Sequence, residues 1–334
     1  MSSAVDPAVA VDAMAEAVAL GEAVRQVSPP NPWVGAVVIS RDGRRRYGGA
    51  TEAPGGRHAE IVALDHAGDD AAGGILVVTL EPCSHHGRTG PCADAIIESG
   101  ITTVVMAIED PDPLVAGAGR RRLEDAGLKV LIGVGADRVE ASLAAYLHHR
   151  RTGRPLVVLK LAGTLDGRTA ARDGSSKWIT GAEARADVHE LRARSDAIIV
   201  GAGTVRADDP ALTARTTPPA ARQPLRVVLG HAPPEAQVHP CWERSGDLGE
   251  VLDELGGAGV LQVLVEGGAT VAHDFVAADL VDRFVLYLAP AIMGGDDGSP
   301  LLRGIGAPTM EQVRRGRFIS VTQLGEDLRL EVAA

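Results

Sequence analysis

Three side chains that are suited to share one metal ion constrain the fold of this chain most strongly. His58-Ala59-Glu60 is followed further along by Pro82-Cys83 and then by Cys92. A neutral imidazole and two thiolates balance the charge of Zn²⁺ and leave a fourth tetrahedral position open for water, as in catalytic zinc sites. We therefore expect a fold that brings His58, Cys83 and Cys92 together around one ion.

The hydrophobic pattern predicts helices and strands that alternate around these ligands. The predicted helices are Val11–Val24, Ala59–Ala67, Cys92–Ser99 and Asp137–Leu147, and the predicted strands are Val34–Ile39, Ile75–Leu80 and Thr103–Ile108. Arg41-Asp42-Gly43 has the composition of a hairpin turn, so a further strand should follow it. This alternation indicates a layered α/β domain. Cys92 would lie in the first turn of its helix, where free N–H groups favour a thiolate.

Glu60 fits the role of general acid and base beside such an ion. In zinc nucleobase deaminases the metal acidifies a water that attacks the carbon bearing the amine, and a nearby Glu moves the proton onto the leaving ammonia. The usual spacing is P-C-x-x-C, whereas the longer segment Ser84–Pro91 separates the two cysteines here. The alternative is a closed structural zinc site made of both cysteines and two of the three histidines His58, His85 and His86.

Length and composition predict two globular domains. The chain has 334 residues, of which 45% are hydrophobic and 23% charged, which is enough for two cores and too apolar for a disordered chain. His148–Pro155 is basic and broken by Gly and Pro, so we predict a linker there, with domains at 1–150 and 154–334. The second half is also predicted to be α/β, with strands at Leu156–Leu161, Ala197–Val200, Leu225–Leu229, Val260–Val265 and Phe284–Leu288.

Charge and residue usage bear on partners and location. A net charge of −11 repels polyanions and aromatic residues are only 3% of the chain, so we expect no nucleic acid partner. No apolar run reaches the roughly 18 residues that a membrane span needs, and acidic residues interrupt the apolar N-terminal stretch, so we expect neither a membrane span nor a signal peptide. Three cysteines are too few for a disulfide framework, which favours the cytoplasm, and Cys241 is assigned no role.

Two strands of the second half run into glycine-rich turns. The turn Gly201–Arg206 has Arg206 where the dinucleotide fingerprint requires glycine, so an ordinary Rossmann site is not supported. Glu266-Gly267-Gly268 precedes a helix predicted from about Thr270, and free N–H groups at such a helix start can bind pyrophosphate. The alternative is that these glycines only close tight turns.

A helix that carries several arginines is predicted between these strands. Thr180-Gly181-Ala182-Glu183 has the pattern of a capping box and would start this helix. The helix carries Arg185, Arg192 and Arg194. Helical arginines mostly solvate a surface, so by themselves they indicate no site.

Several motifs, taken in order, resemble one family. They are Asn31-Pro32-Trp33-Val34-Gly35, His58-Ala59-Glu60, the run Leu80–Cys92, Asp110-Pro111-Asp112-Pro113, Val115-Ala116-Gly117, Lys160-Leu161-Ala162, Leu165-Asp166-Gly167-Arg168, Trp178-Ile179-Thr180, Asp208–Thr213 and Glu266-Gly267-Gly268. Together they resemble the bifunctional riboflavin-biosynthesis deaminase/reductase family, which has the same extended cysteine spacing. The resemblance covers nearly the whole chain.

The resemblance implies an α/β fold in both halves, with an N-terminal three-layer domain like cytidine deaminase and a C-terminal domain like dihydrofolate reductase. The implied activities are zinc-dependent hydrolytic deamination of 2,5-diamino-6-ribosylamino-4(3H)-pyrimidinone 5′-phosphate and NADPH-dependent reduction of its ribosyl group to ribityl. The implied cofactors are one Zn²⁺ per chain and NADPH, and a homo-oligomer is compatible with the family. The rival functions are deamination of RNA bases, with the second half as an accessory domain, and a non-enzymatic scaffold whose zinc only holds the fold.

The resemblance also implies roles for single residues. The deaminase pocket would be lined by Asn31, His85, Arg88 and Asp110. The substrate phosphate in the reductase would be held by Ser176, Arg192, Leu212 and Arg215. NADPH would be contacted by Ala162, Trp178, Thr204, Asp208, Gly268, Ala269, Thr270, Val271, Ala272, His273 and Asp274. The polar candidates for stabilising the reacting sugar are Lys160, Asp208 and Glu266. The chain has Asp112 where the family often has Asn, and Thr51 where the family often has His.

Overall fold

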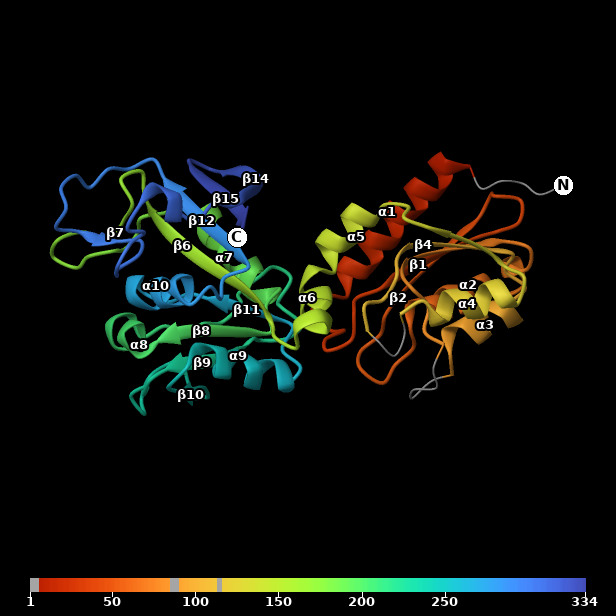
Figure 1. Cartoon of the computed structure of the whole chain (residues 1–334), viewed down its shortest axis with the longest axis horizontal. Coiled ribbons are helices and arrows are strands. Elements are labelled where there is room, and N and C mark those ends of the chain that lie inside the picture. The colour runs from red at the N-terminus through yellow and green to blue at the C-terminus, as the bar shows by residue number, and fades with distance from the viewer. Residues whose placement is uncertain (1–5, 85–89, 113–115) are drawn as a thin grey trace. The chain divides into compact units, whose positions relative to one another are not determined.

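The computed structural model describes residues 6–84, 90–112 and 116–334. The chain forms two compact units, Met1–Thr152 and Gly153–Ala334, each with its own sheet (Figure 1). Both units are α/β, as predicted. Among the described residues, no helix is both long and apolar enough to cross a membrane.

The first unit is built on a five-stranded sheet in the order β2-β1-β3-β4-β5. Its strands are β1 (Gly35–Ile39), β2 (Arg46–Ala50), β3 (Ile75–Leu80), β4 (Thr103–Ile108) and β5 (Lys129–Ile132). β1 and β2 form the predicted hairpin. β3, β4 and β5 are parallel, so their carboxyl ends meet at one edge of the sheet. β1, β3 and β4 are almost wholly buried because helices cover both faces.

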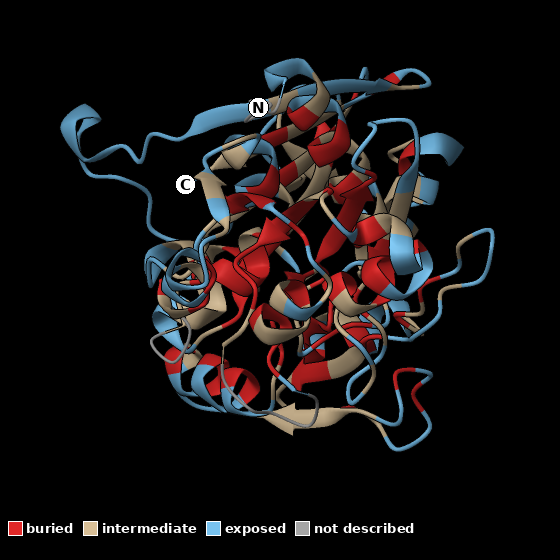
Figure 2. Cartoon of the chain, turned by 90° about the vertical axis from the view of Figure 1, so that its right-hand side faces the viewer, coloured by how far each residue is buried: buried red, intermediate tan, exposed pale blue. Residues whose placement is uncertain are grey.

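Helices on both faces of this sheet complete three layers (Figure 1). α1 (Pro7–Ala23) and α5 (Ala136–Ser142) pack on one face, and α2 (Ala59–Ala67), α3 (Cys92–Glu98) and α4 (Ala118–Asp125) lie on the other. A short 3₁₀ turn, η1 (Gly68–Ala71), and α6 (Ala144–Thr152) complete the unit. Glycines allow close packing, since a Cβ at Gly35 would lie 1.8 Å from the Ala17 carbonyl oxygen of α1. Buried residues concentrate in the sheet and the helix sides that face it (Figure 2).

The second unit has an eight-stranded sheet in the order β10-β9-β8-β11-β6-β12-β15-β14. Neighbouring strands from β10 to β12 are parallel, and β15 and β14 add antiparallel pairs at the other edge. The strands are β6 (Leu156–Thr164), β8 (Ala197–Gly201), β9 (Leu225–Leu229), β10 (Trp242–Arg244), β11 (Gln262–Val265), β12 (Arg283–Ala289), β14 (Arg317–Leu324) and β15 (Asp327–Ala333). A small separate sheet pairs β7 (Arg168–Ala170) with β13 (Ser299–Pro300).

The core of the second unit lies between the parallel strands and two helices. Leu252 and Leu255 of α9 (Leu248–Gly257) and Phe275 of α10 (Ala269–Ala277) belong to one buried cluster with Ile199 and Val263 of the sheet. The remaining helical segments are α7 (Ala182–Ala193), α8 (Ala202–Asp208) and the 3₁₀ turn η2 (Met310–Gln312). This core fixes the carboxyl ends of β8 and β11, where the two glycine-rich turns begin.

Two local predictions need correction. The boundary between the two units falls inside the predicted linker His148–Pro155. The segment is nevertheless helical through Thr152, because α6 continues past Leu147 with basic residues in its last turn, where they complement the helix dipole. The predicted capping box at Thr180 is not formed, since the N-cap of α7 is Gly181 and no side chain caps the helix. The Gly181 N–H instead donates to the Asp327 carboxylate over 2.6 Å.

Candidate functional site

The three predicted metal ligands lie together in the first unit. Nδ1 of His58 is 3.2 Å from Sγ of Cys92 and 3.6 Å from Sγ of Cys83, and the three ligand atoms all lie within 4.8 Å of one another. In a tetrahedral zinc site with Zn–N of about 2.0 Å and Zn–S of about 2.3 Å, ligand atoms are separated by about 3.5 Å. The arrangement and chemistry of these donors fit one Zn²⁺.

Three element ends position these ligands. His58 is the N-cap of α2, Cys83 follows the carboxyl end of β3, and Cys92 begins α3. Cys92 therefore lies in the first turn of its helix, as predicted. Its backbone N–H donates to Sγ of Cys83 over 3.4 Å, and the N–H of Ala93 donates to the Cys83 carbonyl over 3.1 Å. The start of α3 thus holds the Cys83 backbone and stabilises the Cys83 thiolate.

The titratable groups of this cluster shift one another's pKa values. Glu60 is 3% exposed, and burial, followed by the nearby Cys83, raises its pKa to about 7. Contacts from Cys92 and His58 lower the pKa of Cys83 to about 4, whereas the contact with Cys83 raises the pKa of Cys92. A divalent cation would allow both thiolates to form. Glu60 would remain a group that can take up and release a proton near neutral pH.

Asp110, a predicted pocket residue, lies in a buried network beyond the carboxyl end of β4. Its carboxylate accepts hydrogen bonds from the hydroxyl of Tyr146 over 3.0 Å and from the N–H of Asp112 over 2.9 Å. Burial raises the pKa of Asp110. The Asp112 carboxylate, where the family often has Asn, is 3.7 Å from the guanidinium of Arg150 on α6. This departure from the family therefore has a charge partner within the unit.

The other residues expected near this pocket differ in what they contact. Asn31 lies half-buried in the loop between α1 and β1, where its N–H donates to the Ser28 carbonyl over 2.9 Å. The buried Thr51 hydroxyl accepts the N–H of Val34 over 3.1 Å, which ties the end of β2 to the start of β1. His85 and Arg88 lie outside the described residues.

Glu81 is a buried carboxylate whose role the sequence pattern does not predict. It is 4% exposed, and it accepts three backbone hydrogen bonds, from Asp110 over 3.2 Å, Gly117 over 2.9 Å and Arg120 over 3.0 Å. It therefore ties the start of α4 and the Asp110 segment to the strand end that leads to Cys83. The available signal was an acidic residue directly after the apolar run of β3.

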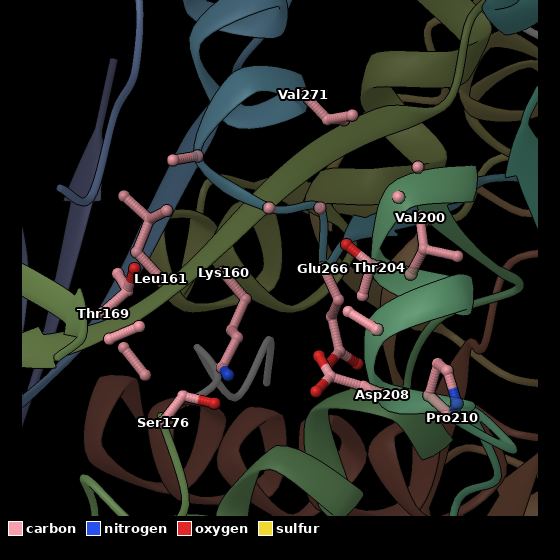
Figure 3. Close-up of a pocket in the computed structure, with 18 of the residues that line it drawn as sticks. Lys160, Leu161, Thr169, Ser176, Val200, Thr204, Asp208, Pro210, Glu266 and Val271 are labelled. Carbon is pink, nitrogen blue, oxygen red and sulfur yellow. The ribbon is translucent and has the colours of Figure 1, made fainter. Parts of the chain in front are cut away.

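A cavity of about 1090 Å³ opens in the second unit. Lys160, Ser176, Asp208 and Glu266 face the same space from β6, the segment after β7, α8 and the end of β11 (Figure 3). Typical ligand pockets measure about 300–1,000 Å³, so this cavity is at the large end of that range. The predicted reductase residues that line it are Lys160, Ala162, Ser176, Trp178, Arg192, Thr204, Asp208, Leu212, Arg215, Glu266, Gly268, Ala269, Thr270 and Val271.

A buried ion pair lies in the wall of this cavity. Arg192 donates to both carboxylate oxygens of Glu266, over 2.6 and 2.9 Å, and its third contact is to the Thr213 carbonyl over 3.2 Å. The two charged side chains are 14% and 9% exposed. Burial lowers the pKa of the neighbouring Lys160, while the Glu266 charge raises it and the Arg192 charge lowers it. Because Arg192 already pairs with Glu266, we expect Arg215 to make the larger part of the predicted phosphate contact.

The turn between β11 and α10 brings its backbone close to neighbouring groups. A Cβ at Gly267 would lie 2.5 Å from the Val271 side chain, and one at Gly268 would lie 3.4 Å from Oγ1 of Thr204. Gly268 is the N-cap of α10 with no side-chain cap, so the first N–H groups of this helix remain available to an anion. The arrangement fits the pyrophosphate of a dinucleotide.

Three residues predicted to contact the cofactor do not line the cavity. Ala272 is fully buried in the hydrophobic core. Nε2 of His273 is 3.0 Å from the Ile305 carbonyl oxygen, so its ring faces another loop. Asp274 is the next residue along α10, and its carboxylate lies 3.5 Å from Nδ1 of His273. The part of the predicted run that reaches the cavity is therefore its first turn, from Gly268 to Val271.

Positive charge dominates the described lining of the cavity, although the chain has a net charge of −11. Asp208 and Glu266 are its two acidic members, and the seven cationic ones are Lys160, Lys177, Arg185, Arg192, Arg206, Arg215 and Arg303. Lys177, Arg185, Arg206 and Arg303 were not predicted as contacts, because a surface cation and a ligand-binding cation look alike in sequence. Arg185 lies 4.5 Å from the ring centroid of the exposed Trp178, which it orients by a cation–π contact. This lining suits phosphorylated ligands.

Comparisons with known proteins decide the family. The chain is 45% identical to the riboflavin biosynthesis protein RibD of Mycobacterium tuberculosis over 333 residues, with 97% of each chain covered. It is 36% identical to RibD of Escherichia coli, with 96% of this chain and 98% of that one covered. The family model described as RibD C-terminal domain matches residues 155–330. The chain belongs to the RibD family.

Further comparisons agree with membership of the RibD family. A model described as the cytidine and deoxycytidylate deaminase zinc-binding region matches residues 9–108. The structure is similar to that of Acinetobacter baumannii RibD, with a TM-score of 0.91 and 35% identity over 98% of this chain and 99% of that one. A Thermotoga maritima structure, described as a diaminohydroxyphosphoribosylaminopyrimidine deaminase/5-amino-6-(5-phosphoribosylamino)uracil reductase, gives a TM-score of 0.89 and 34% identity over the same shares.

Membership of the RibD family confirms the main expectations from the sequence. The chain is a bifunctional deaminase and reductase of riboflavin biosynthesis, with a zinc-binding deaminase region and an NADPH-dependent RibD C-terminal domain. The cytidine-deaminase-like and dihydrofolate-reductase-like folds are confirmed as well. RibD membership leaves the two rival functions, an RNA-base deaminase and a non-enzymatic scaffold, without support.

Proposed function

We propose that the chain deaminates 2,5-diamino-6-ribosylamino-4(3H)-pyrimidinone 5′-phosphate in residues 1–150 and reduces the ribosyl group of the product to ribityl in residues 154–334, in the cytoplasm. The observation that carries the proposal is the meeting of His58, Cys83 and Cys92 beside the buried carboxyl of Glu60. The name of the Thermotoga maritima relative, which states both activities, supports the substrate. The acidic net charge argues against a nucleic acid partner.

In the deaminase half, His58, Cys83 and Cys92 would hold the metal and Glu60 would move the proton. Zinc held there supplies a water acidic enough to be a nucleophile at neutral pH. Glu60 would take a proton from the attacking water as the C–O bond forms and would pass it to the amino nitrogen, so that ammonia leaves as the C–N bond breaks. Asn31 and Asp110 would orient the pyrimidine, together with His85 and Arg88.

In the reductase half, the cationic cavity would hold the substrate phosphate and NADPH together. NADPH supplies the hydride. Lys160 is the group suited to deliver a proton to the sugar oxygen as the ring opens, and Glu266 keeps the ammonium form available by its charge. Arg215 and Ser176 would bind the phosphate. Thr204, Asp208 and the turn from Gly268 to Val271 would contact NADPH, with its pyrophosphate at the start of α10.

The two half-reactions can be tested separately in the full-length protein. Purified enzyme is incubated with the pyrimidine ribosylamine phosphate, with and without NADPH, while ammonia release and NADPH absorbance are followed. We expect Cys83→Ser to abolish ammonia release and to leave NADPH oxidation intact when the deaminated intermediate is supplied. Lys160→Met and Asp208→Ala should abolish NADPH oxidation and leave ammonia release intact.

The matched control is Glu254→Gln, which removes an exposed carboxylate paired with Arg244 and should change neither step. Loss of both activities in Cys83→Ser and in Lys160→Met alike would contradict the division of labour between the two halves. Release of ammonia by Cys83→Ser at the wild-type rate would remove the metal cluster from the reaction.

A further inference from the structure

A second group of metal-binding side chains lies in the second unit, away from the cavity. His239, Cys241 and Glu243 each offer a ligand atom, and these atoms all lie within 4.8 Å of one another. None of the three lines the cavity. His239 and Cys241 lie at the end of the segment that connects β9 to the edge strand β10, and Glu243 lies in β10.

Local geometry brings these three side chains together. Residues two apart on an extended chain point to the same side, and Cys241 and Glu243 are spaced in this way at the start of β10. His239 lies on the other side of the bend at Pro240, and its Nδ1 reaches Sγ of Cys241. Trp242, between two of them, packs against the hydrophobic core cluster. Its neighbours Cys241 and Glu243 therefore point to the other side of the sheet edge.

The His239 ring is held in the orientation that a metal ligand needs. Its Nε2 is 2.9 Å from the carbonyl oxygen of Pro233. Because a carbonyl can only accept a hydrogen bond, Nε2 carries the proton and Nδ1 of the neutral ring presents its lone pair. Nδ1 lies 3.5 Å from Sγ of Cys241, which is about the N···S separation across a tetrahedral zinc ion. Metal-bound histidines commonly donate their other N–H to a backbone carbonyl in this way.

The Glu243 carboxylate is held in place as well. Its Oε1 accepts the backbone N–H of Ala232 over 2.9 Å, and its Oε2 is 2.8 Å from Nδ1 of His231. Supporting hydrogen bonds of this kind orient ligating carboxylates in metal sites. The group therefore offers nitrogen, sulfur and oxygen donors. Hydrogen bonds to neighbouring residues orient two of the three side chains, His239 and Glu243.

We propose that His239, Cys241 and Glu243 form a second zinc site, separate from the one at His58. Imidazole, thiolate and carboxylate are the three ligand types that proteins use for Zn²⁺, and a solvent molecule would complete the tetrahedron. The ion would fasten the segment after β9 to the edge strand β10, which pairs with β9 alone in its sheet. The three ligands lie outside the first unit and do not line the cavity, so neither half-reaction depends on this ion.

Metal content of the full-length protein tests this site. The protein is loaded with a small excess of Zn²⁺, dialysed, and analysed for zinc per chain by mass spectrometry. We expect two ions in the wild type and one in Cys241→Ser, in His239→Gln and in Cys83→Ser. The matched control, Glu235→Gln, changes an exposed carboxylate on the same segment and should keep two. Ammonia release and NADPH oxidation should be unchanged in Cys241→Ser.

A second readout identifies the donor sulfur. In the Cys83→Ser/Cys92→Ser protein, Cys241 is the remaining cysteine, so Co²⁺ should produce a thiolate-to-cobalt absorption band that disappears on addition of Zn²⁺. One zinc ion in the wild type and the same single ion in Cys241→Ser would overturn the proposal, as would the absence of that band. Either result would leave the assignment of zinc to His58 intact.

Discussion

The metal cluster and the reductase cavity are assembled in different ways. The ligands of the cluster come from three element ends in one stretch of the chain, at the starts of α2 and α3 and after β3. The cavity takes its lining from β6, α7, α8, the β11–α10 turn and a loop beyond β13. Short motifs therefore indicate the first site directly, whereas the topology of a whole sheet is needed to form the second.

The two sites also differ in the charge that they hold. In the first, burial raises the pKa of Glu60 to about 7, so that its carboxyl can exchange a proton near neutral pH beside the cysteine ligands. In the second, most charges are cationic, and the buried carboxylate of Glu266 is neutralised by Arg192. The first arrangement suits the movement of a proton, and the second suits the binding of anions.

The largest expected effect is at the first site. Glu60→Gln should keep zinc bound, since none of its three ligands changes, but should slow ammonia release by roughly 10²–10⁴-fold because the general acid and base is lost. Rates of ammonia release and zinc content measured on the same preparation check this. Asp65→Asn, an exposed change on the same helix, is the matched control. Unchanged ammonia release in Glu60→Gln would exclude Glu60 from proton transfer.

The way in which each site is assembled also explains what could be predicted from the sequence. The bounds of β3, β4, β9 and α2 were predicted to the residue, because each is a continuous apolar or helical run bounded by turn residues. The cluster of His58, Cys83 and Cys92 was predicted because catalytic zinc sites require those residue types. Glu81 was missed because its partners are backbone N–H groups, which carry no sequence signal.

Elements without a strong apolar period were missed. The edge hairpin of β14 and β15 was not predicted, because β14 is largely exposed and its pattern does not separate a core side from a solvent side. Among residues 216–249 the strand at Leu225–Leu229 was predicted, whereas the short β10 and the start of α9 were not. The cavity arginines beyond those placed by family resemblance were missed for a related reason, since a surface arginine and a ligand-binding arginine look alike in sequence.

An intermediate effect is expected at the start of α10. The backbone of Gly268 is extended, with φ −66° and ψ 174°, so valine is compatible with the chain itself. Its Cβ would lie 3.4 Å from Oγ1 of Thr204, and its methyl groups would crowd the proposed pyrophosphate position. We expect Gly268→Val to raise the KM for NADPH by about tenfold, which corresponds to about 1.4 kcal/mol, with ammonia release unchanged.

The matched control for this variant is Gly257→Val, where an added Cβ would meet nothing within 4 Å. Steady-state NADPH oxidation at several cofactor concentrations separates KM from kcat. If Gly268→Val keeps the wild-type KM, the pyrophosphate does not lie at this turn. An equal loss in the control would mean that the effect comes from the stability of the unit.

The smallest expected effect is a shift in pH dependence at the reductase cavity. Burial lowers the pKa of Lys160, the Glu266 charge raises it, and the Arg192 charge lowers it. Glu266→Gln removes the one contribution that favours the ammonium form and leaves Arg192 without its neutralising partner. Lys160 should then lose its proton at a lower pH than in the wild type.

The measurable consequence is on the alkaline side of the rate profile. If protonated Lys160 delivers the proton to the sugar, NADPH oxidation falls as pH rises through the Lys160 pKa, and Glu266→Gln moves this fall to lower pH. Ammonia release, measured in parallel, should keep its profile because the deaminase site does not contain Lys160. An alkaline fall that stays in place in Glu266→Gln while Lys160→Met remains inactive would assign Lys160 to binding instead of proton transfer. The two sites would then differ in chemistry more than proposed, with proton movement confined to the metal cluster.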